Sequence, residues 1–134
     1  MDGEGAKCES LLTAKLSHEG KKTIYDRAIV IQCREGEKII AADGGEKTIG
    51  IVRKGLVEIR KKNQKVALLA EGDIFGEIAF ILNIPRTADV IAVMPETEVV
   101  FLSLSMINRL TNMKDQTQIW KNLAQIIAYR LSQL

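Results

Sequence analysis

The sequence of 134 residues is 46% hydrophobic and 27% charged, which is typical of one globular domain with its own core. Its formal net charge of +2 is too small to indicate a nucleic acid or an anionic membrane as a partner. The apolar runs are too short to cross a bilayer and no charged-then-apolar leader opens the chain, so we expect a cytoplasmic protein.

Composition also excludes several classes of enzyme. His18 is the single histidine, which rules out a histidine-rich oxygenase site and disfavours a Cys/His zinc site. No GxSxG, GxxxxGK[ST] or GxGxxG motif is present. Cys8 and Cys33 are expected to be free thiols, as in a reducing compartment. The sequence therefore predicts a binding protein that uses no metal or cofactor and is not an enzyme.

The N-terminal segment is polar and contains glycine, so we place a tail at residues 1–15 and the folded domain at residues 16–134. Scattered apolar positions between Leu11 and Asp26 predict one or two short helical segments, with a break near Gly20.

Residues 28–104 alternate short β-rich runs with turn signals. Strands at this spacing, uninterrupted by a long helix, predict an antiparallel sandwich or barrel rather than a parallel sheet. The predicted strands are AIVIQC, EKIIAA, TIGIVR, LVEIRK, KVALLA, ADVIAVM and TEVVFLSL.

The C-terminal part, residues 105–134, is predicted to be helical. Ser105 is a candidate cap for a short helix through Leu110, and Asp115 for a longer helix that runs to Leu134 without Gly or Pro. This helix carries two neighbouring stripes, one of Trp120, Ala124, Ile127, Leu131 and Leu134 and one of Ile119, Leu123, Ile126 and Arg130. Two stripes allow the helix to contact its own β-domain and a partner at once, so docking on the domain and homodimerisation both stay open for the first stripe.

The segment FGEIAFILNIPRTADV, residues 75–90, does not follow strand alternation. Its apolar run after Glu77 predicts a short buried helix that ends at Asn83 and Ile84-Pro85. The first turn of such a helix has free backbone N–H groups that favour an anion.

The charged residues of this segment define a ligand. Arg86 is suited to an anionic pair of oxygens, whereas Glu77 accepts hydrogen bonds and is suited to a hydroxyl beside that anion. Gly76 permits a close approach of ligand and backbone. A compact molecule with a phosphate and a nearby free hydroxyl, such as a ribose cyclic phosphate, meets these requirements. A structural ion pair between Glu77 and Arg86 is the alternative.

The segment strongly resembles the phosphate-binding cassette of the cyclic-nucleotide-binding domains, FGE[LI]A followed by PR[TAS]A. The spacing from Glu77 to Arg86 matches the kinase and ion-channel members without a gap, and the catabolite activator is a more distant relative. Further similarity extends over roughly residues 16–134. The resemblance implies an eight-stranded antiparallel β-roll at about residues 28–104, with an N-terminal helix and two C-terminal helices.

By the same resemblance, Glu77 accepts from the ribose 2′-hydroxyl beside the Gly76 backbone, and Arg86 pairs with the cyclic phosphate. Thr87 contributes its backbone N–H and is a selectivity position, because threonine there often favours cGMP over cAMP. The expected ligand-binding residues are Phe75, Gly76, Glu77, Ile78, Ala79, Arg86, Thr87 and Ala88.

Three further positions bear on this interpretation. Asp89 replaces a Ser or Thr of the family and weakens an anion site if it points inward, but strand alternation predicts that it points outward. Trp120 and Tyr129 are candidates to cap the base, although packing is the more common role for each.

We therefore expect a sensor domain for cAMP or cGMP, in which ligand shifts the position of the C-terminal helix and so changes what a homodimer partner or an effector protein meets. The alternative is an interaction or dimerisation module that keeps the fold without a ligand. Direct DNA binding is not expected, because no helix-turn-helix domain follows and the cluster Arg60, Lys61, Lys62 and Lys65 resembles a solvated hairpin tip.

Overall fold

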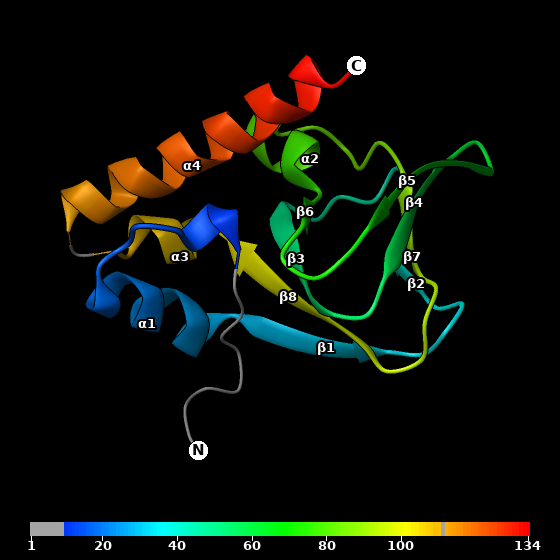
Figure 1. The fold of residues 1–134 in the computed structure, drawn as a ribbon, viewed down its shortest axis with the longest axis horizontal. Helices are drawn as coiled ribbons and strands as arrows, with labels where there is room; N and C mark the ends of the chain where they lie inside the picture. Colours follow the sequence, from blue (N-terminus) through cyan, green and yellow to red (C-terminus); the bar gives the residue numbers. More distant parts are fainter. Residues whose placement is uncertain (1–9, 111) are drawn as a thin grey trace.

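The computed structural model describes residues 10–110 and 112–134 and confirms the predicted β-roll with flanking helices. Two four-stranded antiparallel sheets form the roll, in the orders β1-β8-β3-β6 and β2-β7-β4-β5 (Figure 1). The strands are β1 (Ile29–Cys33), β2 (Lys38–Ile40), β3 (Thr48–Lys54), β4 (Val57–Lys61), β5 (Gln64–Leu69), β6 (Ile74–Phe75), β7 (Asp89–Ala92) and β8 (Thr97–Ser103). Strand alternation did not single out β6, because a strand of two residues has no period.

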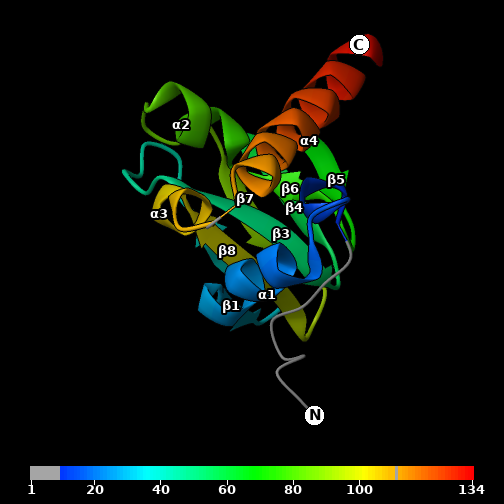
Figure 2. The same cartoon turned by 90° about the vertical axis from the view of Figure 1, so that its left-hand side faces the viewer.

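The helices gather at one end of the roll, to the left in Figure 1 and toward the viewer in Figure 2. The short α2 lies on the side of the β-roll and contacts α4 through Phe80 on Trp120 and through Glu77 on Arg130. The helical elements are the 3-10 helix η1 (Leu11–Thr13) and the α-helices α1 (His18–Arg27), α2 (Glu77–Leu82), α3 (Leu104–Asn108) and α4 (Met113–Ser132).

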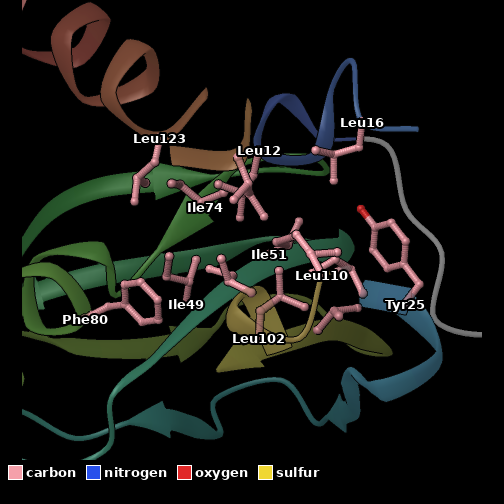
Figure 3. Close-up of a cluster of buried hydrophobic side chains, with 14 residues drawn as sticks. Leu12, Leu16, Tyr25, Ile49, Ile51, Ile74, Phe80, Leu102, Leu110 and Leu123 are labelled. Atoms are coloured by element: carbon pink, nitrogen blue, oxygen red, sulfur yellow. The ribbon is translucent and has the colours of Figure 1, made fainter. Parts of the chain in front are cut away.

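The larger hydrophobic core lies between the helices and the sheet that contains β3 and β8 (Figure 3). Leu123 points from α4 toward Ile74 and Leu12, and all three side chains are buried. A second cluster fills the inside of the roll, where the rings of Phe75 and Phe101 meet edge to face at 5.8 Å. Of the two predicted stripes of α4, the one with Ile119 and Leu123 faces the core, and Ile127 of the other stripe also packs against it.

Polar contacts fix the N-terminal half of α4. Asp115 accepts hydrogen bonds from the backbone N–H of Ser17, at 2.8 Å, and from the Ser17 hydroxyl. The buried amide of Asn122 donates to the carbonyls of Leu12 and Ala14 at 2.9 and 2.7 Å. α4 is therefore tied to the N-terminal segment at two points.

Several predicted boundaries were wrong. Gly20 lies in the first turn of an unbroken α1, where the close approach of Asp115 leaves no space for a β-carbon. α3 is capped by Ser103 rather than Ser105, and α4 is capped by Asn112, whose Oδ1 accepts from Lys114 N at 2.8 Å, rather than by Asp115.

The N-terminal expectations have separate outcomes. Residues 1–9 of the predicted tail, including Cys8, lie outside the described residues. Residues 11–13, which were predicted to belong to the tail, form η1 and bury Leu12 completely in the core. Cys33 is a buried free thiol, and burial raises its pKa, with a smaller contribution from Glu37. No helix within the described ranges is long and apolar enough to cross a membrane.

We predict that Asn122→Ala lowers the free energy of unfolding by about 1–3 kcal/mol, because two carbonyls of the N-terminal segment lose their buried donor. Urea unfolding at constant pH measures this change. Gln125→Ala, at an exposed position of the same helix, is the matched control and should change stability by less than about 0.5 kcal/mol. Equal effects of the two substitutions would contradict the role given to Asn122.

Candidate functional site

The predicted short helix is present as α2, and glycine opens it. Gly76 precedes α2 with φ of 81°, a left-handed conformation that glycine adopts without strain, and its carbonyl accepts from the N–H of Phe80 at 3.3 Å. Asn83 ends α2 with φ of 55°, ahead of Ile84-Pro85 as the sequence predicted. These two left-handed residues, Gly76 and Asn83, fix where the ends of α2 lie relative to the sheets.

Arg86 lies buried at the base of this cassette, with 3% of its surface exposed. Its Nη1 donates to the carbonyls of Thr48 and Gly76, each at 3.0 Å, and its Nη2 donates to the Thr48 hydroxyl at 3.0 Å. Its Nε is buried and has no hydrogen-bond partner among the described residues. A buried charged donor without an acceptor is costly, so this nitrogen is suited to an anionic ligand.

The backbone of Arg86 is also held in place. Its N–H donates to the Gly44 carbonyl and its own carbonyl accepts from Asp43 N–H, both at 2.8 Å. The Asp43-Gly44-Gly45-Glu46 loop therefore packs onto the cassette. Glu46 places Oε1 3.9 Å from the Arg86 Nε, but its side chain is 65% exposed. Burial lowers the pKa of Arg86, whereas Glu46 and Glu77 raise it, and the guanidinium stays charged at neutral pH.

Glu77 does not pair directly with Arg86. Its Oε1 accepts a charge-assisted hydrogen bond from Nη1 of Arg130, in the last turns of α4. Nη2 of Arg130 donates to the Ile74 carbonyl at 2.6 Å. The Glu77 side chain is 10% exposed, so the carboxylate lies at the edge of the interior with its other oxygen free of described partners. The predicted alternative of a structural Glu77–Arg86 ion pair was wrong.

One cavity brings the predicted residues together. It has a volume of about 410 Å³ and lies between the cassette, the β4–β5 hairpin and α4. All eight residues expected from the sequence line it. Phe75 and Ala79 are buried there, whereas Ile78 and Thr87 are exposed at the surface. An apolar cavity with a few convergent polar groups is the usual form of a small-molecule site.

Asp89 points away from this cavity, as strand alternation predicted. Its Oδ1 accepts from the Ala42 N–H at 2.7 Å and its Oδ2 lies 3.5 Å from Lys38. The backbone hydrogen bond from Ala42 is the main reason that the pKa of Asp89 is lowered. The carboxylate that departs from the family pattern therefore adds no charge to the cavity.

Sequence reasoning did not identify Arg130 as a site residue. The sequence does contain a sign of its role. Arg130 is the one charged member of the stripe that also contains Ile119 and Leu123, and this stripe faces the domain.

The aromatic candidates of α4 do not line the cavity. Trp120 packs against Phe80 of α2 with ring centroids 6.0 Å apart, and Tyr129 is 67% exposed. Within the described ranges, no group of three or more His, Cys, Asp or Glu side chains is arranged to hold a metal ion.

Comparison with known proteins identifies this arrangement. The family model of the cyclic nucleotide-binding domain matches residues 30–113, which include β2 to β8 and the whole cassette. The chain belongs to the cyclic nucleotide-binding domain family. The family is one of regulatory ligand-binding domains rather than of catalytic ones.

Three relatives illustrate the range of the family. The chain is 34% identical over 86 residues to a cAMP-dependent protein kinase regulatory subunit of Yarrowia lipolytica, covering 64% of this chain and 23% of that protein. It is 36% identical over 72 residues to a cGMP-dependent protein kinase of Plasmodium berghei, covering 54% and 8%. The catabolite activator protein of Thermus thermophilus superposes with a TM-score of 0.76 at 26% identity, covering 92% of this chain and 59% of that one. The chain thus spans a quarter or less of the length of the two kinase-related proteins.

We predict that Gly76→Ala lowers the free energy of unfolding by about 1–3 kcal/mol, because φ of 81° strains an alanine. Its β-carbon would also lie 2.6 Å from Nη1 of Arg86. Gly45→Ala is the matched control in a neighbouring loop, since a β-carbon added there would meet no described atom within 4 Å. Thermal and urea unfolding distinguish the two, and a Gly76→Ala protein as stable as the Gly45→Ala protein would refute the close packing of Gly76 on Arg86.

Proposed function

We propose that the cavity binds a 3′,5′-cyclic nucleotide, with the phosphate on Arg86 and the ribose 2′-hydroxyl on Glu77. The observation that supports this most strongly is the buried Nε of Arg86, which has no described acceptor although Nη1 and Nη2 each donate to the surrounding structure. Glu77 directly follows Gly76 in the chain, and the Gly76 carbonyl accepts from Arg86. The two proposed ligand contacts, Arg86 and Glu77, are therefore neighbours at this glycine. In a cyclic nucleotide the phosphate and the 2′-hydroxyl likewise lie on neighbouring carbons.

The backbone around Arg86 supplies the remaining donors in this proposal. The N–H groups of Ile78 and Ala79 lie in the first turn of α2, where a helix leaves such groups free for an anion. The Thr87 N–H follows Arg86 at the other end of the cassette. Phe75 and Ala88 line the cavity and would form an apolar wall beside the ribose. The proposed role is binding and regulation, without catalysis.

The coupling of this site to α4 is the second part of the proposal. The N-terminal half of α4 is fixed by Asp115, Asn122 and the core, whereas the polar contacts of its last turns with the roll run through Arg130. A ribose hydroxyl that binds Glu77 acts on the partner of Arg130 directly. We propose that nucleotide binding thereby changes the position or the order of the C-terminal turns, as a shift between two populated states.

The exposed stripe of α4 supports a second candidate role, as an interface for another copy of the chain or an effector protein. Trp120 and Leu131 are 39% and 63% exposed on this stripe. An interaction module that has lost its ligand would need only this surface. The complete ligand-side arrangement around Arg86 favours the sensor over that alternative.

We predict that Arg86→Ala weakens cyclic-nucleotide binding by about 2–5 kcal/mol, because the phosphate loses its charged partner. Arg86→Lys keeps the charge but loses the planar fork and should also weaken binding. Glu77→Ala should cost about 1.5–3 kcal/mol, and a 2′-deoxy ligand should lose the same amount with the unmodified protein. Equilibrium binding of a fluorescent cyclic nucleotide measures each change. Arg109→Ala, at an exposed arginine after α3, is the control. Unchanged affinity in the Arg86 and Glu77 variants would show that the site is placed wrongly.

We predict that nucleotide changes amide hydrogen exchange in residues 126–134 and that Arg130→Met removes this response. Without ligand, the Arg130→Met protein should exchange about 2- to 5-fold faster in these residues, because the contact with Glu77 is lost. Lys121→Met, on the exposed face of the same helix, should behave like the unmodified protein. Identical protection with and without nucleotide in the unmodified protein would rule out the coupling.

For the interface role, we predict that Leu131→Glu abolishes self-association measured by sedimentation velocity, because a charge then lies in the apolar stripe. Gln125→Glu adds the same charge at another exposed position of α4 and should leave association unchanged. A monomeric unmodified protein at all concentrations would leave α4 available for an effector protein instead of a second copy.

A further inference from the structure

β1 is an edge strand with exposed apolar side chains. It lies at one end of the order β1-β8-β3-β6 and pairs with β8 alone among the described strands, along the lower border of the roll in Figure 1. Ile29, Val30 and Ile31 are 59%, 38% and 37% exposed. Edge strands are usually protected from pairing by a charge or a proline, and the sequence IVIQC of β1 contains neither. In the described part of the chain, the outer edge of β1 is therefore open to another strand.

A cleft between the two sheets adjoins this edge. Ile29 and Ile31 lie on the same face of β1 as Cys33, which is buried inside the roll. The cleft lies between β1 and β2, the edge strand of the other sheet, and has a volume of about 470 Å³. Its apolar lining consists of Ile29, Ile31, Ile39, Ile40, Ala41 and Phe101. A strand that pairs with β1 would cover the exposed side chains at the mouth of this cleft.

The charges that flank β1 are complementary to those of a second copy of the strand. Asp26 and Arg27 precede β1, Arg34 and Glu35 follow it, and all four residues are exposed. Arg27 and Glu35 make no side-chain hydrogen bond or ion pair with a described residue. If two copies pair antiparallel with Ile31 opposite Ile31, the register places Arg27 of each copy opposite Glu35 of the other. Two pairs of opposite charges then flank the apolar strands.

The same register also matches the faces of the two strands. Because residues directly opposite each other share one face of a sheet, the side chains that face the cleft in one copy continue those of the other copy. A neighbouring register, with Val30 opposite Ile31, would place Arg27 opposite Arg34 and turn the cleft-facing residues of one copy to the other face. Like charges directly opposite each other are destabilising. Charge and face therefore favour the register centred on Ile31.

We infer that β1 is an interface between two copies of the chain, which pair antiparallel about Ile31 and join their four-stranded sheets into one continuous sheet. The contact is isologous, since each copy contributes the same strand and the same two charges. It is separate from the nucleotide cavity and from α4, which lies on the opposite side of the roll (Figures 1 and 2). Because β1 has only 5 residues, we expect a dissociation constant of about 1 mM for this contact alone. Copies that are already joined, for example through α4, would form it more readily.

Nuclear magnetic resonance over a range of protein concentrations tests this interface, because sedimentation of dilute protein does not populate a contact of this strength. Every protein in the experiment carries Leu131→Glu, which removes the proposed contact through α4. Between about 0.05 and 2 mM, we expect the amide resonances of residues 27–35 to shift and the rotational correlation time to rise about 1.5-fold. Ile31→Lys places two like charges opposite each other at the centre of the contact and should remove both changes.

Charge reversal tests the register. Arg27→Glu and Glu35→Arg each place like charges opposite each other at both ends of the contact, so each variant alone should pair about 5-fold more weakly. An equimolar mixture of the two variants restores opposite charges at both ends and should pair about as tightly as the parent protein. Arg109→Glu, which reverses an exposed arginine after α3, is the control and should leave pairing unchanged.

Each other outcome overturns the inference. If the parent protein shows no change at the highest concentration, β1 does not pair with a second copy and its edge is left for a strand of another protein. Concentration-dependent shifts confined to residues outside 27–35 would place the contact elsewhere. If the mixture pairs no better than either variant alone, Arg27 and Glu35 do not lie opposite each other. The charge-reversal variants change only exposed residues, so their result stands even if Ile31→Lys fails to fold.

Discussion

The cavity depends on the burial of one positive charge, the guanidinium of Arg86. Placing an arginine at 3% exposure is costly unless its donors find acceptors. The surrounding structure supplies acceptors for Nη1 and Nη2 through Thr48 and the Gly76 carbonyl, and leaves Nε without one among the described residues. The left-handed Gly76 is necessary because any β-carbon there would contact the guanidinium. The cassette, β3 and the loop that contains Gly44 are thus arranged around a cation whose Nε is suited to the anionic ligand proposed above.

The attachment of α4 has two different parts. Its first turns belong to the core, because Ile119 and Leu123 are buried and Asn122 holds two carbonyls of the N-terminal segment. Its last turns meet the roll through Arg130, whose partner Glu77 is half of the proposed ligand contact. A helix that is held by the core at one end and by Arg130 at the other is suited to report occupancy of the proposed site. The proposed ligand would act on one of the two polar contacts of Arg130, the one with Glu77.

Much of this arrangement was accessible from the sequence. Alternating strands predicted an antiparallel sandwich or barrel, and the run after Glu77 predicted the short helix. The resemblance to the cyclic-nucleotide-binding domains implied the roll and the eight residues that line one cavity. The partner of Glu77 was not predicted, because Arg130 lies 53 positions away and the contact exists only once α4 has docked. The caps at Ser103 and Asn112 were missed for a related reason: several Ser, Asn and Asp residues near a helix start are equivalent in sequence, and packing decides among them. The predicted break at Gly20 was wrong because the close approach of Asp115, which requires glycine there, is a tertiary feature.

The most direct test of the central claim is isothermal titration of the protein with cAMP and cGMP, with 5′-AMP and 5′-GMP as controls. The controls carry the same bases and a 2′-hydroxyl, but their phosphate is not also bonded to the 3′ carbon beside that hydroxyl. Saturable heat with at least one cyclic nucleotide, and none with the 5′-monophosphates at the same concentrations, is the predicted result. No heat and no shift in melting temperature with either cyclic nucleotide would contradict the account and leave the exposed face of α4 as the functional surface.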